Sequence, residues 1–317
     1  MPHVGNYFGA IKPAIERIAD GEGGGFLFIA DYHALTTVKD AELLRQYVKE
    51  IACTWLACGL DAGKTIFYRQ SDVPEIFELA TILSNSTPKG LLNRAHAYKA
   101  AVQMSLDAGK DPDNDVNMGL FNYPVLMAAD ILAFGTNFVP VGSDQKQHCE
   151  IASDIAKAFN HVYGQVLTIP EALILKEQAV LPGLDGRKMS KSYGNQIPLF
   201  VPEKQLEKYI KRIVTDSSDP NQPKTTHVPI FQLYKLFASE QETKVMEEKF
   251  AKGISWGEVK GELFTVANRQ LASLREKYNY YMENYTEVEK ILAKGALRAR
   301  EVATKTLARV RKAIGAG

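Results

Sequence analysis

The sequence has few cysteines, no long apolar run and no leader-like start, and each shortage excludes a class of protein. Cys53, Cys58 and Cys149 are an odd number at unrelated spacings, which excludes a disulfide framework and a four-ligand zinc site and favours a reducing compartment such as the cytoplasm. The most apolar long stretch, residues 123–134, contains Asp130 and is too short to span a bilayer. No basic and then apolar segment follows Met1, so we expect no secretory signal and no membrane anchor.

Net charge is also nearly absent, at +1 over 317 residues, and by itself indicates no particular partner. The composition, 45% hydrophobic and 24% charged, is that of a globular chain long enough for two domains. Basic residues do gather near the carboxyl end, where residues 294–312 hold seven lysines and arginines against one acid, Glu301. Such a run can meet a phosphate backbone or can simply be the solvated face of a helix.

The first two hundred residues alternate between strand-like and helix-like segments. Short apolar runs at residues 26–30, 64–68 and 138–141 predict strands, and residues 40–58 have the spacing of a helix that ends at Gly59. This alternation predicts an α/β fold with a mostly parallel sheet, which binds ligands beyond the carboxyl ends of its strands. From about Pro202 helical periodicity takes over, and we place a domain boundary near residue 200. The last helix is expected to bury one face, formed by Leu292, Ala296, Ala299, Ala303, Leu307, Val310 and Ile314.

The first motif with chemical content is His3-Val4-Gly5-Asn6, which begins an amphipathic helix interrupted by Pro13. A helix start offers unpaired amide hydrogens to phosphate, and His3 and Asn6 add side-chain donors. A four-residue motif is weak evidence, because a helix capped by Asn6 beside an incidental histidine has the same sequence.

The second motif is Lys188-Met189-Ser190-Lys191-Ser192, which follows a turn-forming segment that ends at Gly186. Two lysines and two serines in five residues can neutralise the charge that builds on a departing pyrophosphate. A basic loop is usually solvated surface, but this string is far more specific than a basic loop in general.

The third motif has two parts. Tyr123-Pro124-Val125-Leu126-Met127-Ala128-Ala129-Asp130 places one carboxylate in an apolar helix, where it needs a hydrogen-bond donor. Val139-Pro140-Val141-Gly142-Ser143-Asp144-Gln145-Lys146-Gln147-His148 follows at the end of a strand. A structural hydrogen bond is the alternative explanation for Asp130.

In their order and spacing these motifs, together with Val214-Thr215-Asp216-Ser217, resemble the tryptophanyl-tRNA synthetases over nearly the whole chain. The resemblance implies a Rossmann-like parallel-sheet catalytic domain in residues 1–200, with the signature loop at 188–192. It also implies a mainly helical anticodon-binding domain in residues 201–317. The implied activity is a ligase that activates L-tryptophan with ATP and Mg²⁺ and transfers it to the 3′-terminal adenosine of tRNA(Trp). A cytoplasmic homodimer is implied as well.

Position by position, the resemblance implies catalytic roles for His3, Asn6, Lys188 and Lys191. The residues that it implies for ATP binding are His3, Gly5, Asn6, Gly142, Ser143, Asp144, Val180, Lys188, Met189, Ser190, Lys191 and Ser192. Those implied for tryptophan binding are His33, Tyr123, Met127, Asp130, Val139, Val141 and Gln145, with Asp130 accepting the indole N–H. Lys99 is a further candidate for a phosphate contact, and no dedicated metal ligands are expected.

One departure keeps alternatives open. Family members usually begin with a strand and a glycine-rich turn before the first motif, whereas this chain starts at the motif itself. We therefore expect either that the start of the chain was trimmed or assigned too late, or that the protein as given is impaired in its activity. The alternatives are a truncated, non-catalytic tRNA-binding paralogue, a tyrosine-specific synthetase and, with least support, a small-molecule adenylyltransferase.

Overall fold

The computed structural model describes residues 2–20, 25–142, 145–174 and 181–317. Two compact units share the chain, and each is assembled from three stretches. The first unit contains Met1–Gly24, Lys49–Lys64 and Gln178–Val288, and the second contains Gly25–Val48, Thr65–Glu177 and Glu289–Gly317. Neither unit ends at residue 200, so the division into 1–200 and 201–317 stays a prediction.

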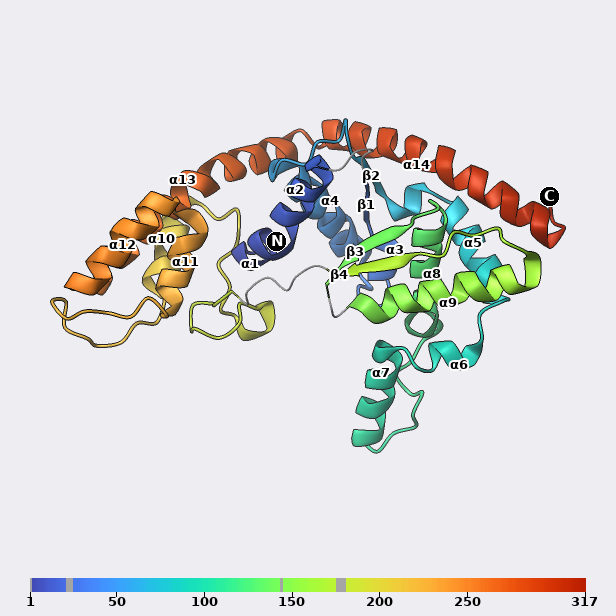
Figure 1. The fold of residues 1–317 in the computed structure, drawn as a ribbon, viewed down its shortest axis with the longest axis horizontal. Coiled ribbons are helices and arrows are strands. Elements are labelled where there is room, and N and C mark those ends of the chain that lie inside the picture. The colour runs from blue at the N-terminus through green and yellow to red at the C-terminus, as the bar shows by residue number, and fades with distance from the viewer. Residues whose placement is uncertain (1, 21–24, 143–144, 175–180) are drawn as a thin grey trace. The chain divides into compact units, whose positions relative to one another are not determined.

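The strands of the second unit are short and parallel. β1 (Phe26–Ile29) pairs with β2 (Ile66–Arg69), and β3 (Phe138–Val141) pairs with β4 (Glu171–Ile174), so the described residues hold two two-stranded sheets (Figure 1). The predictions of the first and third strands are confirmed, and the second strand begins two residues later than predicted. β4 was not predicted. Parallel strands joined through helices confirm the expected α/β class.

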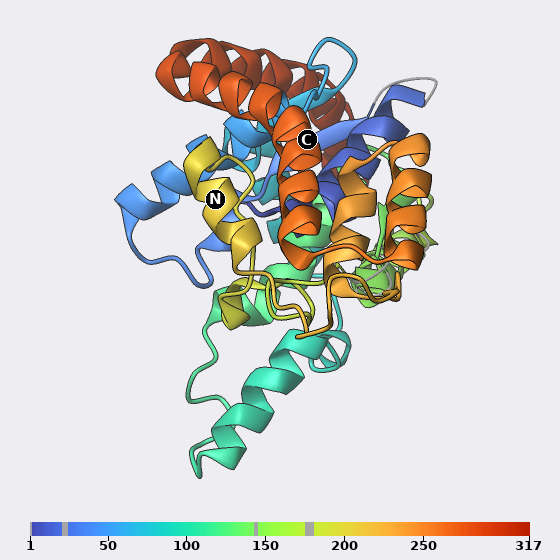
Figure 2. The same ribbon diagram turned by 90° about the vertical axis from the view of Figure 1, so that its left-hand side faces the viewer.

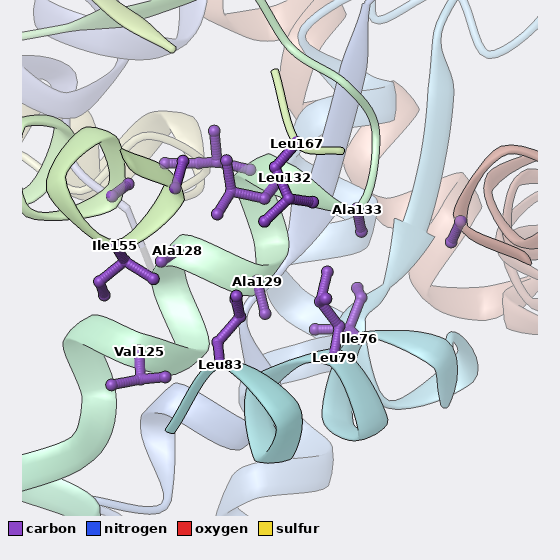
Figure 3. Close-up of a cluster of buried hydrophobic side chains, with 14 of the residues drawn as sticks. Ile76, Leu79, Leu83, Val125, Ala128, Ala129, Leu132, Ala133, Ile155 and Leu167 are labelled. Carbon is purple, nitrogen blue, oxygen red and sulfur yellow. The ribbon is translucent and has the colours of Figure 1, made fainter. Parts of the chain in front are cut away.

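Helices pack beside these strands to form the core of the second unit. α8 lies against both α5 and α9, and their buried aliphatic side chains meet in one cluster (Figure 3). The cluster includes Ile76, Leu79 and Leu83 of α5 together with Leu132 of α8 and Ile155 of α9. The helices that lie wholly in this unit are α3 (Asp31–Ala34), α5 (Glu75–Ser84), α6 (Lys89–Leu92), α7 (His96–Asp107), α8 (Met118–Leu132) and α9 (Lys146–Tyr163), with the 3₁₀ turn η2 (Gln70–Asp72) after β2.

α14 (Tyr285–Ile314) completes this core with the face that the sequence predicted. Ala296, Ala299, Ala303, Leu307 and Val310 all belong to the buried cluster, and Ile314 packs against it. Three of its basic side chains bind groups elsewhere in the second unit. Arg300 pairs with Glu75 at 3.0 Å, Arg311 pairs with Glu78, and Arg298 donates to the carbonyl of Thr65. These three arginines are thus part of the packing of the helix, whereas Lys294, Lys305 and Lys312 are exposed, so both explanations of the basic run stay open.

α7 and the loop that follows it project from the rest of the second unit in both views (Figure 1, Figure 2). α7 ends at Asp107, and Asn117 caps the start of α8 with its side chain. Lys99 lies on α7 and is exposed.

α4 (Ala41–Ala57) matches the helix predicted for residues 40–58, and Gly59 ends it with a φ of +103°. The chain enters the first unit through α1 (Val4–Asn6), a π-helical turn η1 (Tyr7–Ile11) and α2 (Lys12–Asp20). The interruption expected at Pro13 takes the form of that π turn directly before α2. The remaining helices of the first unit are the 3₁₀ turn η4 (Lys191–Tyr193), α10 (Glu203–Lys211), α11 (Pro229–Phe237), α12 (Glu240–Lys252) and α13 (Trp256–Glu283).

The core of the first unit lies where α13 packs against α10 and α11. Phe231 and Phe250 meet edge to face, and Phe200 stacks on Tyr278 with 4.0 Å between ring centres. Beyond Pro202 the described chain is helix and loop, as predicted. None of the helices in the described ranges is both long and apolar enough to cross a membrane.

Candidate active site

The first motif lies at the start of α1, in the first unit, and its two polar side chains bind each other's backbone. His3 is the N-cap, and its Nδ1 accepts from the amide of Asn6 at 3.3 Å. The side-chain oxygen of Asn6 accepts in return from the amide of His3 at 3.1 Å. This is the reciprocal pattern of a capping box. The alternative in which Asn6 caps the helix is wrong, because Asn6 is the third helical residue.

The surroundings of His3 favour its neutral form. Burial, and then the positive charge of Lys191, lower the pKa of His3 below its ordinary value. A neutral imidazole whose Nδ1 accepts must carry its proton on Nε2. His3 therefore has one N–H left to donate to a ligand.

The second motif forms a tight loop in the same unit. Pro182 and Lys188 form an antiparallel bridge, which Met189 extends by donating its amide to the carbonyl of Leu181 at 2.8 Å. Ser190 then caps η4 by accepting from the amide of Ser192 at 3.2 Å. The side chains of Lys188 and Lys191 are exposed, and neither has an acidic partner in the described part of the chain. Both ammonium groups are available to an anion.

Asn195 holds this loop together, and sequence reasoning missed it. Its side-chain nitrogen donates to Asp185 at 2.6 Å and to the carbonyl of Lys188 at 3.1 Å, while its side-chain oxygen accepts from the amide of Ser190 at 2.8 Å. Only 3% of Asn195 is exposed, and a Cβ on Gly183 would lie 2.4 Å from its side chain. The sequence signal that could have indicated this role is the position of Asn195, three residues after the signature loop.

The two motifs contact each other although about 185 residues separate them. The amide of Gly5 points at the sulfur of Met189 at 3.3 Å, and the amide of Val4 donates to the carbonyl of Ile197 at 2.9 Å. A side chain at position 5 would crowd the His3 ring at 2.9 Å, so the close approach needs glycine. The fold thus brings together a histidine N–H and two free lysines, which is a cationic, donor-rich site.

The third motif lies in the second unit, around Asp130. Tyr123, Met127 and Asp130 are spaced by four and three residues and share one face of α8. Asp130 is buried, with 4% exposed. Its Oδ2 contacts Nε2 of His33 at 2.8 Å, and the amide nitrogen of Gln70 donates to Oδ1 at 2.9 Å and to Oδ2 at 3.0 Å. The structural hydrogen bond that was the alternative explanation is thus present.

The electrostatics of Asp130 are set by opposing effects. Burial raises the pKa of its carboxyl group, the hydrogen bonds from His33 and Gln70 act against that rise, and the charge of Asp31 adds to it. Burial, and then the charge of Asp130, raise the pKa of the nearby Tyr68 hydroxyl. Gln70 is a second residue that sequence reasoning missed, because only the fold brings it to Asp130.

A hydrogen-bonded chain joins Tyr123 to Gln145. The Tyr123 hydroxyl lies 2.6 Å from Nε2 of His148, whose Nδ1 lies 2.8 Å from the side-chain oxygen of Gln145. An amide oxygen only accepts, so His148 carries its proton on Nδ1 and Tyr123 donates to Nε2. The chain of hydrogen bonds thus runs from the Tyr123 hydroxyl through His148 to the side-chain oxygen of Gln145.

The other predicted site residues divide into two groups. Val139 and Val141 on β3, Met127 and Gly142 are half-buried in the second unit. Ser143, Asp144 and Val180 lie outside the described residues. His3 and the signature loop belong to the first unit and Asp130 to the second, so their meeting around one substrate stays a prediction. The described ranges contain no group of three or more metal-ligating side chains.

A family model described as class I tRNA synthetases (W and Y) matches residues 1–272, and the chain belongs to this family. Among named relatives, the tryptophan–tRNA ligase of Neisseria meningitidis is 48% identical over 317 residues, covering 99% of this chain and 94% of that protein. The Pseudomonas aeruginosa tryptophan–tRNA ligase is 49% identical, covering 99% of this chain and 71% of that protein.

A solved structure shows the same fold. Tryptophanyl-tRNA synthetase from Campylobacter jejuni, crystallised with ADP and tryptophan, superposes with a TM-score of 0.90 at 43% identity. The match covers 99% of this chain and 96% of that one. The resemblance inferred from the motifs is confirmed.

Proposed function

We propose that this protein is a tryptophan–tRNA ligase that joins L-tryptophan to ATP as an adenylate and then to the 3′-terminal adenosine of tRNA(Trp). The observation that carries the proposal is the contact between the Gly5 amide and Met189, which keeps His3 beside the two free lysines of the signature loop. Support also comes from full-length relatives that bear the name tryptophan–tRNA ligase.

In the adenylate step the tryptophan carboxylate attacks the α-phosphorus in line and pyrophosphate leaves. The protein supplies no nucleophile, only orientation and charge stabilisation. Lys188 and Lys191 neutralise the departing phosphates, and the Nε2–H of His3 donates to a phosphate oxygen. Asn6 holds His3 in place for that contact. The proposed adenosine contacts are Gly5, Gly142, Ser143, Asp144, Val180 and Met189, and Ser190 and Ser192 are proposed for the phosphates.

Selectivity for tryptophan is proposed to come from the buried acceptor Asp130. A site built around an acceptor rejects a side chain without a matching donor by roughly 10⁴-fold or more, which excludes phenylalanine. Gln145 binds the amino and carboxylate end. The proposed walls of the side-chain pocket are His33, Tyr123, Met127, Val139 and Val141.

Mg²⁺ fits this site as a companion of ATP. Magnesium is usually held by one or two carboxylates together with substrate phosphates, and the described residues form no dedicated cage. When bound, the ion neutralises phosphate charge beside the two lysines. Lys99 on the projecting α7 is a further proposed phosphate contact.

The remaining parts of the proposal follow from the family. Residues 201–317 are proposed to bind the tRNA anticodon. The protein is proposed to act in the cytoplasm, because translation takes place there. It is also proposed to be a homodimer. A sedimentation measurement that gives the mass of one 35.2 kDa chain would contradict the dimer.

Amino-acid-dependent ATP–pyrophosphate exchange across tryptophan, tyrosine and phenylalanine tests the function. We expect exchange with tryptophan alone. Exchange with tyrosine would establish the tyrosine-specific alternative, and tRNA binding without any exchange would establish the non-catalytic one. Asp130→Asn is expected to lower tryptophan use strongly with an unchanged circular dichroism spectrum, and near-normal kinetics would contradict the indole assignment.

A further inference from the structure

We propose that Gln70 is a positioning residue for substrate selectivity: it holds both oxygens of Asp130 so that the carboxylate offers a single acceptor position, on Oδ1, to the side chain of the amino acid. The inference rests on the proposed function and extends it to a residue outside the signature motifs. It stands on the geometry of the cluster formed by His33, Gln70 and Asp130 in the second unit.

The orientation of the Gln70 amide is fixed from its other end. Its side-chain oxygen accepts from the amide of Tyr32 at 3.2 Å, so its nitrogen must be the atom that faces Asp130. Gln70 is fully buried at the end of β2, where the strand passes into η2. A buried amide whose oxygen and nitrogen are both engaged has one orientation, and Gln70 therefore acts as a rigid donor toward the carboxylate.

An ionised carboxylate has about four acceptor positions, two on each oxygen. A single nitrogen that lies 2.9 Å from Oδ1 and 3.0 Å from Oδ2 uses the two inner positions. His33 contacts Oδ2 alone, at 2.8 Å, and because Gln70 takes the inner positions we assign His33 to the outer position on Oδ2. Among the described residues, the outer position on Oδ1 is left. An indole N–H can occupy it, whereas a ring that carries sulfur or a C–H at that place cannot donate to it.

Gln70 also favours the ionised form of Asp130, which accepts hydrogen bonds. Its N–H stabilises the carboxylate against the penalty of burial, as does His33. The titratable groups that act on Asp130 are His33 and Asp31 on α3 and Tyr68 on β2. Without the Gln70 donor, burial shifts Asp130 toward a neutral carboxylic acid, which accepts more weakly and can itself donate. The pocket then loses its preference for N–H.

The test compares tryptophan with β-(benzothiophen-3-yl)alanine, in which sulfur replaces the indole N–H. Both are assayed in ATP–pyrophosphate exchange with the wild-type chain, with Gln70→Met and with the control Gln103→Met on the exposed face of α7. Methionine keeps the length of glutamine and removes its donor. We expect Gln70→Met to lower kcat/KM for tryptophan about 10- to 100-fold, the range for a hydrogen bond to a charged group. The kcat/KM for the analogue should change less than about 3-fold, and KM for ATP should stay constant.

If Gln70 had a merely structural role, Gln70→Met would lower kcat/KM for both substrates by the same factor. The ratio of the two kcat/KM values would then be unchanged, and that result overturns the proposal. If the wild-type chain gives no tryptophan-dependent exchange, the proposed function fails first and this inference fails with it. If the wild-type chain discriminates between the substrates and Gln70→Met discriminates equally, the inference alone fails.

A second variant guards against loss of folding in the first. Gln70→Glu places a second carboxyl group against Asp130, and two adjacent carboxylates share one proton. Below the raised pKa of that pair the new carboxyl group donates to Asp130 as the amide did. Tryptophan use by Gln70→Glu is therefore expected to recover as the pH falls, whereas Gln70→Met shows no such recovery. Identical pH profiles for the two variants would overturn the proposal.

Discussion

Gly295 is the residue at which local preference and packing disagree most sharply. It lies inside α14, where alanine would favour the helix by about 1 kcal/mol. A Cβ at this position, however, would lie 1.8 Å from the carbonyl oxygen of Phe67, a backbone atom of β2 that cannot rotate away. We expect Gly295→Ala to lower the free energy of unfolding by about 1–3 kcal/mol, because overpacking outweighs propensity.

The matched control is Gly261→Ala in α13, where a new Cβ would meet nothing within 4 Å. That change is expected to raise the free energy of unfolding by up to about 1 kcal/mol. Urea denaturation of both variants measures the contrast. Equal effects at the two glycines would show that α14 does not lie against β2 as described.

His3 carries a pH prediction at the residue scale. Its pKa is lower in the folded chain than the ordinary 6.5, so the folded state binds the proton less readily than the unfolded state does. Stability from the cap is present above pH 6.5 and is lost as the pH falls through the lowered value. His3→Asn can still cap the helix and does not titrate. Thermal unfolding between pH 7.5 and 5 is expected to show a steeper loss for the wild-type chain, and parallel curves would contradict this assignment.

At the scale of elements, α12 and α13 are joined by a carboxylate with two functions. Glu242 completes the capping box of α12 by accepting from the amide of Ser239 at 2.8 Å. It also pairs with Arg269 of α13 through two hydrogen bonds, at 2.8 and 2.9 Å. Hydrogen bonding from Arg269, and then from Ser239, lowers the pKa of Glu242 to about 2.

The depressed pKa of Glu242 means that its contribution to stability is present above the ordinary value of 4.5 and is lost as the pH falls through about 2. Glu242→Gln is therefore expected to unfold at a lower temperature than the wild-type chain at pH 7, with a difference that shrinks between pH 4.5 and 2. Glu248→Gln, on the exposed side of the same helix, serves as the control and should show no difference. A gap that persists unchanged at pH 2 would refute the pairing.

Element positions could be predicted where the pattern was long or buried. The helix at residues 40–58 was found within one residue because its apolar spacing runs for about four turns. β4 could not be predicted, since Glu171, Leu173 and Ile174 are all exposed and the strand has only four residues. The partners that hold the site, Gln70 and Asn195, gave no periodic signal. Gln70 meets Asp130 across 60 residues of sequence, so only the fold could show that contact.

At the scale of the whole molecule, each half of the proposed site is assembled inside one unit. The capped helix start and the signature loop meet in the first unit, and the cluster around Asp130 forms in the second. The order of the motifs was enough to predict the family, because their types and spacing are specific. It could not predict that residues 1–24 pack with residues 178–288, since units assembled from separate stretches depend on tertiary contacts.

The central claim is that the free lysines of the signature loop stabilise the charge on pyrophosphate as it leaves. Tryptophan-dependent pyrophosphate exchange by Lys191→Ala, beside the control Lys204→Ala on the exposed face of α10, tests this most directly. The account predicts a loss of about 10²–10³ in kcat for Lys191→Ala and wild-type turnover for the control. Wild-type turnover by Lys191→Ala would contradict it.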